Sequence, residues 1–435
     1  RPDHRRRGDG PVIDTALRWM TAQEAASHVN AGELDPQDIV RAHLDAIDRF
    51  DGRIHAFIHV DREAMSTAGM TLAVKDSQPV RGMPYTYATP SWRDRIAEHD
   101  AVPVARAREA GIAILGKTNL PELAASIGTT NTLFPPTHNP WREGVTPGGS
   151  SGGSGAAVAA GMCTFALGGD TGGSIRIPAS CCGVVGLRPT PDRVPSEEVD
   201  ATVLQSRGPM TRSVSDARFL FAVMTATHPP APAARRGRRI GFAADGADPA
   251  CAEACRRAAE SLRAAGHRVE EVAWNPKPVT EGYAVVRRAS MASFPADLST
   301  FGPGIQKLAA EGRDLTAMDY FHAFEKATDA ANRAVAMPLQ TRFDFLLTPT
   351  LGLPSMKIDE VPPFLGEAWS RYVQFVLPVT FSRSPAVSIP AGQHAGLPIG
   401  VQLVGQFAQE YELLDFAEEL EKMPGFGFQR PPGLD

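Results

Sequence analysis

Two glycine clusters that contain serines are the segments of this chain best suited to chemistry. The first, Gly-Gly-Ser-Ser-Gly-Gly at residues 148–153, brings backbone N–H groups and hydroxyls together without intervening Cβ atoms. In the second, Ser174 directly follows Thr171, Gly172 and Gly173. Successive N–H groups of this kind can form an anion-binding nest, which becomes an oxyanion hole beside a nucleophilic hydroxyl. The two clusters together favour a site in which backbone N–H groups meet an anion beside a serine hydroxyl.

Other interpretations remain open for the first cluster taken alone. A flexible linker has the same composition, whereas a phosphate-binding loop is disfavoured because no lysine follows the glycines. Ser150 and Ser174 stand 24 residues apart, with short apolar runs between them. Two glycine-flanked serines at this short separation are more consistent with a single site than with two unrelated linkers.

Lys75 is the third candidate, because it ends the apolar run at residues 71–74. A lysine at the end of a buried strand loses hydration, which lowers its pKa toward neutrality and lets it act as a base. Serine needs such a base, since it is a poor nucleophile at its free pKa. The plain alternative for Lys75 is a surface lysine whose stem packs on the strand.

These three elements together resemble the amidase signature family. The matching motifs are Ala-Val-Lys-Asp around Lys75, the glycine cluster around Ser150, and Asp-Thr-Gly-Gly-Ser-Ile-Arg around Ser174. Flanking motifs agree as well, including His-Asn-Pro-Trp at residues 138–141 and Gly-Leu-Pro-Ile-Gly-Val-Gln at residues 396–402.

The resemblance implies a role for each site residue. Ser174 is the acylated nucleophile, Ser150 relays its proton to Lys75, and the peptide bond at Ser150 is typically cis in the family. The remaining expected site residues are the oxyanion donors Thr171, Gly172 and Gly173, the supports Asp170 and Arg176, and the substrate-facing Ala124, Ser150 and Arg383.

Arg383 departs from the family pattern. It stands where the family commonly has a small polar residue near the site. If its side chain faces the substrate, it favours a carboxylate or another acceptor-rich group through a charge-assisted contact.

The expected activity is hydrolysis of a carboxylic amide to an acid and ammonia or an amine, through a seryl acyl-enzyme. The catalytic subunit of a glutamine or asparagine amidotransferase uses the same core and is the first alternative. An esterase of α/β-hydrolase type is a lesser one, because Gly-x-Ser-x-Gly occurs at residues 148–152. That motif needs a strand directly before its serine, whereas residues 142–147 are polar and broken by proline. A scaffold without catalysis is disfavoured, since all three catalytic positions are filled.

The alternation of strand and helix patterns predicts an α/β protein. The resemblance implies one large domain in which a mixed β-sheet is sandwiched between helical layers. We expect a disordered leader at residues 1–18, this domain at 19–425 and a loose tail at 426–435.

Within the domain, residues 234–345 are expected to form a less regular lobe that covers the site. The substrate pocket is expected to be lined by residues 124–134 and 343–385.

Composition excludes several other classes of function. A net charge of −5 and the absence of a basic stripe argue against nucleic acid as a partner. No run of 18 uncharged apolar residues exists, so no membrane span is expected. The five cysteines form no Cys-x-x-Cys pair and are expected to pack in the core of a cytoplasmic protein. His55 and His59 lack a third ligand, so neither a metal nor a cofactor is expected. The predicted partner is a small-molecule amide, and a homodimer is left open.

Overall fold

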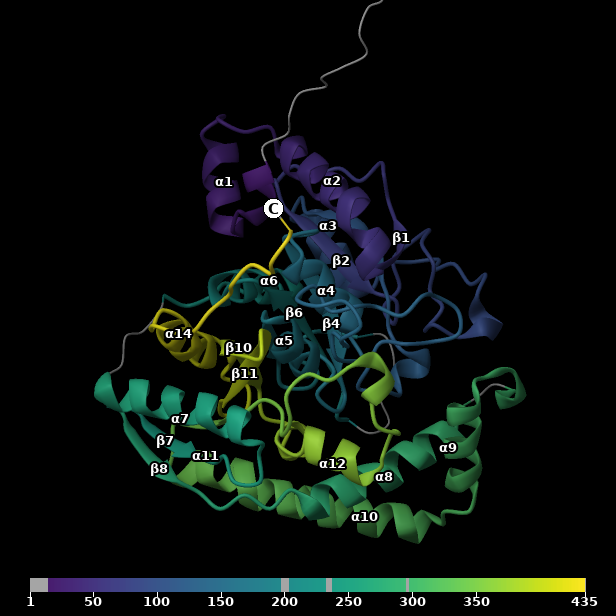
Figure 1. The fold of residues 1–435 in the computed structure, drawn as a ribbon, viewed down its shortest axis with the longest axis vertical. Coiled ribbons are helices and arrows are strands. Elements are labelled where there is room, and N and C mark those ends of the chain that lie inside the picture. Colours follow the sequence, from purple (N-terminus) through teal and green to yellow (C-terminus); the bar gives the residue numbers. More distant parts are fainter. Residues whose placement is uncertain (1–14, 197–202, 232–236, 295–296, 435) are drawn as a thin grey trace, which may run out of the picture.

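A mixed sheet of 11 strands forms the centre of the molecule (Figure 1). The computed structural model describes residues 15–196, 203–231, 237–294 and 297–434. Across the sheet the strand order is β1-β3-β2-β4-β6-β5-β10-β11-β9-β7-β8. The strands are β1 (Phe57–Val60), β2 (Thr71–Lys75), β3 (Ala113–Thr118), β4 (Phe165–Asp170), β5 (Val185–Arg188), β6 (Ser206–Thr211), β7 (Arg239–Phe242), β8 (Arg268–Glu271), β9 (Phe345–Pro349), β10 (Ala386–His394) and β11 (Leu397–Val404).

Helices cover both faces of this sheet. One face packs against α1, α3, α6, α7 and α14, and the other packs against α2, α4, α5 and a group around α13. The predicted α/β fold, with a mixed sheet between helical layers, is therefore confirmed. The helices are α1 (Ala22–Asn30), α2 (Pro36–Ile54), α3 (Val102–Glu109), α4 (Gly152–Ala159), α5 (Arg176–Cys182), α6 (Val214–Thr225), α7 (Pro249–Ala264), α8 (Lys277–Ala292), α9 (Pro303–Arg313), α10 (Ala317–Ala331), α11 (Met337–Thr341), α12 (Glu367–Val373), α13 (Val376–Phe381) and α14 (Glu410–Glu421).

Strand β2 directs Lys75 toward one particular helical layer. Side chains alternate between the two faces of a strand, and Leu72 and Val74 join the core on the α3 side while Ala73 joins the core under α4. Lys75, two residues after Ala73, projects to the same side as α4. Strand β4 runs parallel to β2. The residues at their carboxyl ends, Lys75 and Asp170, therefore lie at the same end of the two strands.

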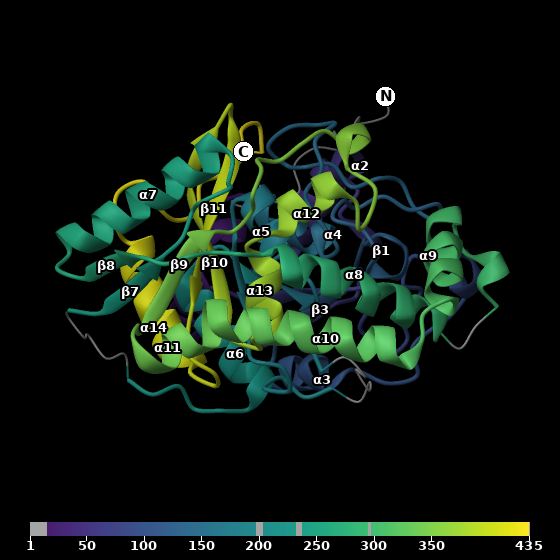
Figure 2. The same ribbon diagram turned by 90° about the horizontal axis from the view of Figure 1, so that it is seen from below.

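Residues 237–345 are more regular than the lobe that we expected from the sequence. Strands β7 and β8 are parallel and extend the common sheet beside β9, because the β7-α7-β8 unit returns its second strand to the same sheet. Most of the remaining described residues are helical, and Figure 2 shows α8 and α10 running alongside each other, as their contacts also indicate. This segment is therefore partly an extension of the sheet and partly a helical wall.

The expected leader and tail also need correction. Residues Thr15–Trp19 form a 3-10 helix, in which Arg18 is buried and donates to the carbonyls of Ala160 and Leu434. Trp19 packs on Phe428, with ring centroids 6.0 Å apart. These contacts hold the tail on the domain through residue 434. The rest of the expected leader, residues 1–14, lies outside the described residues.

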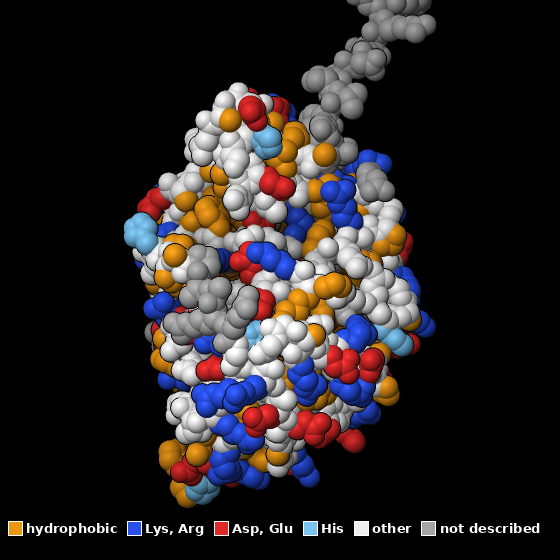
Figure 3. Space-filling view, turned by 90° about the vertical axis from the view of Figure 1, so that its left-hand side faces the viewer, with side chains coloured by type: hydrophobic (Ala, Val, Ile, Leu, Met, Phe, Trp, Pro, Cys, Tyr) orange, Lys and Arg blue, Asp and Glu red, His pale blue; other side chains and the backbone are white. Residues whose placement is uncertain are grey.

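The surface and the cysteines match the composition. On the face drawn in Figure 3, acidic and basic side chains are interspersed. All five cysteines are buried as free thiols, as expected. Within the described residues, no helix has the length and apolar character needed to cross a bilayer, and no three metal-binding side chains cluster together.

Candidate active site

Lys75 and Ser150 are joined by a short buried hydrogen bond. The Lys75 Nζ donates to the Ser150 Oγ at 2.7 Å, and the two residues are only 2% and 1% exposed. The peptide bond between Gly149 and Ser150 is cis, as the resemblance implies. Burial lowers the pKa of Lys75 from 10.5 to about 7, although the charge of Asp170 opposes this shift. Near neutral pH a large fraction of this lysine is therefore free to accept a proton.

A buried carboxylate shapes the loop that carries Ser174. Asp170 accepts the N–H of Gly173 at 2.8 Å and the Nε and Nη2 of Arg176 at 2.9 Å and 3.0 Å. Arg188 contributes a further contact of 3.3 Å. Burial opposes ionisation, but the two guanidinium groups hold the pKa of Asp170 well below its usual range. The expected supports Asp170 and Arg176 thus meet, whereas no motif in the sequence pointed to Arg188.

The nest before Ser174 differs in one donor from the expected set. Gly173 directs its N–H to Asp170, and because an N–H has a single hydrogen, Gly173 shapes the turn and is not available as an oxyanion donor. The N–H groups of Thr171, Gly172 and Ser174 have no acceptor among the described residues. Of the expected donors Thr171, Gly172 and Gly173, the first two thus keep a free N–H group in this structure, and Ser174 adds a third.

Two glycines of this loop leave little room for a side chain, and one of them also has a left-handed backbone. Gly173 has φ of +103°, a conformation that side chains rarely adopt, and a Cβ there would lie 2.6 Å from Val376. A Cβ on Gly172 would lie 2.4 Å from the hydroxyl oxygen of Tyr283. The loop is therefore pressed between α13 and α8, which fixes where its N–H groups point.

Replacing Gly172 with alanine should displace this loop and lower kcat by roughly 10²–10³-fold, the loss typical when an oxyanion donor is misplaced. Gly169→Ala is the matched control, because a Cβ there meets only one atom, at 3.9 Å. Steady-state kinetics on any accepted amide compares the two variants. Equal kcat for Gly172→Ala and the unchanged protein would exclude the N–H of Gly172 from the reaction.

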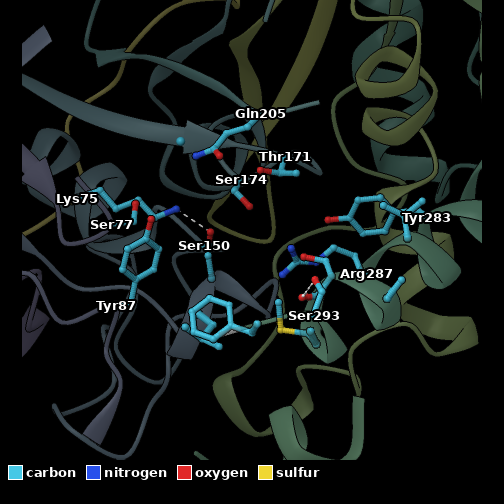
Figure 4. Close-up of a pocket in the computed structure, with 18 of the residues that line it drawn as sticks. Lys75, Ser77, Tyr87, Ser150, Thr171, Ser174, Gln205, Tyr283, Arg287 and Ser293 are labelled. Carbon is cyan, nitrogen blue, oxygen red and sulfur yellow. Dashed lines mark hydrogen bonds between the residues drawn. The ribbon is translucent and has the colours of Figure 1, made fainter. Parts of the chain in front are cut away.

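These groups open into one cavity of about 810 Å³ (Figure 4). Lys75, Ser150, Thr171, Ser174 and Ala124 all line it. Lys75 and Ser150 are buried, whereas Ser174 is half-exposed. The structure thus brings together the three predicted catalytic residues, and it presents Ser174 to anything that enters the cavity.

The cavity wall was largely missed from the sequence. The expected segment 343–385 contributes no lining residue, and the wall comes from α8 and from residues 85–95. On α8 the lining positions recur at helical spacing, which was the available signal. They include Tyr283, Val286, Arg287, Ser290 and Met291, while Ala289 and, just beyond the helix end, Ser293 and Phe294 also line the cavity.

The structure does not bring Arg383 to this cavity. Arg383 has φ of 60°, and its guanidinium lies 5.8 Å from the ring of Phe407 and 3.8 Å from Asp192. It lines a separate cavity of about 430 Å³ with Gln340 and Gln406. The left-handed turn after α13 carries its side chain away from the cavity that Ser174 lines, so the expected contact of Arg383 with a substrate there is wrong.

A second buried lysine supports the segment that follows Lys75. The Nζ of Lys117 donates to Asp76 at 3.1 Å and to the carbonyls of Gln78 and Pro84 at 2.7 Å each. These contacts hold residues 76–84, from which Ser77 reaches the cavity. Lys117 is therefore structural.

Comparison with known proteins gives a consistent result. The family model described as Amidase matches residues 55–414. The chain is 31% identical to a glutamyl-tRNA(Gln) amidotransferase subunit from Moorella thermoacetica, across 95% of this chain and 99% of that protein.

Solved structures agree over nearly the whole chain. A 6-aminohexanoate cyclic dimer hydrolase in complex with its substrate has a TM-score of 0.87 and 27% identity, covering 96% of this chain and 100% of that one. The corresponding glutamyl-tRNA(Gln) amidotransferase subunit from Thermotoga maritima has a TM-score of 0.80 and 28% identity, covering 97% and 99%. With its fold and a family match over most of its length, this chain belongs to the amidase family, whose members act on C–N bonds.

Proposed function

We propose that this protein hydrolyses a carboxylic amide through an acyl-enzyme on Ser174. The observation that carries the proposal is the 2.7 Å hydrogen bond from a buried Lys75 to Ser150, in the cavity that Ser174 also lines. A lysine whose pKa is lowered to about 7 supplies the base that a serine nucleophile needs.

In the proposed reaction, Ser174 Oγ attacks the amide carbon while its proton passes through Ser150 to neutral Lys75. The N–H groups of Thr171, Gly172 and Ser174 stabilise the negative charge that develops on the carbonyl oxygen. Lys75 then returns the proton through Ser150 to the departing nitrogen, which leaves poorly without it. Water releases the acid from Ser174 by the same steps in reverse.

An amidotransferase role is the second candidate, because the curated relatives compared above carry that name. Glutamine or asparagine would bring an α-ammonium group into the cavity. No aspartate or glutamate is among the described residues that line it, so no lining carboxylate pairs with that cation. The lining supports a freestanding hydrolase acting on an amide without an α-ammonium.

The purified chain should hydrolyse aryl or aliphatic amides with kcat/KM at least about tenfold above that for glutamine, since one unpaired charge in a desolvated site costs more than about 1.4 kcal/mol. A panel of aryl, aliphatic and amino-acid amides, with released amine or ammonia measured, tests this expectation. Glutamine hydrolysis that appears only after co-purified partner chains are added would favour the amidotransferase instead.

A further inference from the structure

Arg287 lies in the cavity but has no part in the proposed chemistry. It extends from α8, and Figure 4 shows its guanidinium directed toward the two serines, on the side opposite Lys75. Its position on α8 is shared with the lining residues Tyr283 and Met291, one turn away in either direction. An arginine on the inner, largely apolar side of a helix normally has a hydrogen-bond acceptor or an anion as its partner.

Within the described part of the chain, Arg287 has none of opposite charge. Its Nε is buried without a hydrogen-bond partner, and its guanidinium lies 5.9 Å from the ring of Phe364. The next residue, Arg288, instead pairs with Glu311 at 2.7 Å. A buried donor without an acceptor is unfavourable, so Arg287 is prepared for an acceptor that arrives from outside.

The charges around the cavity have one sign. Besides Lys75, which is neutral when it acts as the base, Arg95 and Arg287 are its charged lining residues, and no carboxylate accompanies them in the described lining. Arg95 is exposed and lies over the ring of Tyr85 at 4.2 Å. A half-buried guanidinium in such surroundings favours an anion, and it binds a carboxylate best through two parallel hydrogen bonds.

The direction of the proposed proton transfer fixes which half of the substrate meets Arg287. The leaving nitrogen must face Ser150 and Lys75, because its proton comes from them. The acyl group then extends to the other side of Ser174, where Arg287 lies (Figure 4). Val286, Met291 and Phe294 line the cavity on the same wall and offer apolar contact to a hydrocarbon chain.

We infer that the substrate is an amide whose acyl group ends in a carboxylate, and that Arg287 binds that carboxylate. This inference rests on the proposed function and narrows it to ω-carboxyacyl amides. Such a substrate places its anion at Arg287 and its scissile bond at Ser174, with the hydrocarbon segment between them.

The test uses 4-nitroanilides of succinic, glutaric and adipic acid, each compared with an uncharged alkanoic 4-nitroanilide of equal length. The best carboxylate substrate should exceed its uncharged counterpart in kcat/KM by roughly 10–100-fold, the range for a charge-assisted hydrogen bond. Arg287→Gln should reduce this ratio to about one, and Arg287→Lys should retain part of it. Arg288→Gln, the matched control, should keep the full ratio because Arg288 already pairs with Glu311.

Glutarate binding to the Ser174→Ala protein, measured by calorimetry, tests the same contact without turnover. Arg287→Gln should weaken it by at least about tenfold, and Arg288→Gln should not. Two results would overturn the inference while leaving amide hydrolysis intact. The unsubstituted protein could show no preference for the charged anilides, or the Arg287→Gln variant could retain that preference. Glutarate binding through Arg287 without hydrolysis of any amide would instead refute the proposed function and retain the carboxylate site.

Discussion

The Ser174→Ala variant is expected to lose amide hydrolysis by on the order of 10⁵–10⁶-fold, the loss that follows removal of a nucleophilic serine. Without this hydroxyl no acyl-enzyme forms, and only the residual acceleration from the oxyanion donors and substrate binding remains, about 10³–10⁴-fold over the reaction in water. The fold should survive, because the contact of this residue with Ser151 uses its backbone carbonyl. Single-turnover kinetics measure the loss of amide hydrolysis. A fluorophosphonate label, mapped by mass spectrometry, should attach to Ser174 in the unsubstituted protein and not to residue 174 of the variant.

Ser150→Ala is the matched control for Ser174→Ala. It removes the proton relay but leaves the nucleophile, so it should slow hydrolysis less for substrates with good leaving groups. It should also still accept the label on Ser174. A label on Ser150, together with turnover by Ser174→Ala, would reverse the two roles.

Substitution of Lys75 should produce the second large effect, a loss of about 10²–10⁴-fold for amides at neutral pH. Burial brings the pKa of this lysine to about 7, so kcat/KM should rise with pH and level off above a midpoint near 7. Below that midpoint Lys75 is protonated and cannot accept the proton of Ser174. Profiles from pH 5 to 10 for Lys75→Met, which preserves side-chain volume, should lack this rising limb.

Matched esters provide the internal control. An alcohol leaves more readily than an amine, so Lys75→Met should impair ester hydrolysis less than amide hydrolysis. If the rising limb persists in Lys75→Met, or if amides and esters lose activity equally, another group is the base. His55 and His138, whose rings lie 6.1 Å apart, are outside the cavity lining and would not explain such a result.

The residues that we propose as catalytic could be located from sequence because their signals are local. Ser150 and Ser174 each lie within a glycine-rich motif, and Lys75 ends a recognisable strand. Their meeting follows from the parallel pairing of β2 with β4, which sets Lys75 and Asp170 at the same edge. The direction of the lysine pKa shift was likewise available from burial alone.

The cavity wall could not be predicted in the same way. Arg287 and Arg288 are adjacent and identical in type, and only the packing of α8 decides that one faces the cavity while the other meets Glu311. Arg383 illustrates the opposite error, since its place in the chain suggested the site but its left-handed backbone turns it toward Phe407. Gly173 was misassigned because its competing acceptor, the Asp170 carboxylate, is set by tertiary geometry.

The cavity wall and the proposed catalytic residues come from different elements, and this has a consequence for how the substrate range of such a protein can evolve. Helix α8 packs mainly on four other helices, α9, α10, α12 and α13, whereas Lys75 and Asp170 stand at the carboxyl ends of two neighbouring interior strands, β2 and β4. Apart from Tyr283, which contacts the Gly172 loop, the lining positions of α8 such as Val286, Arg287 and Met291 can therefore change without displacing Lys75, Ser150 or Ser174. Duplicated genes could evolve new substrate ranges through substitutions in this one helix while the reaction stays the same. A protein designer could vary the same helix positions to change the substrate.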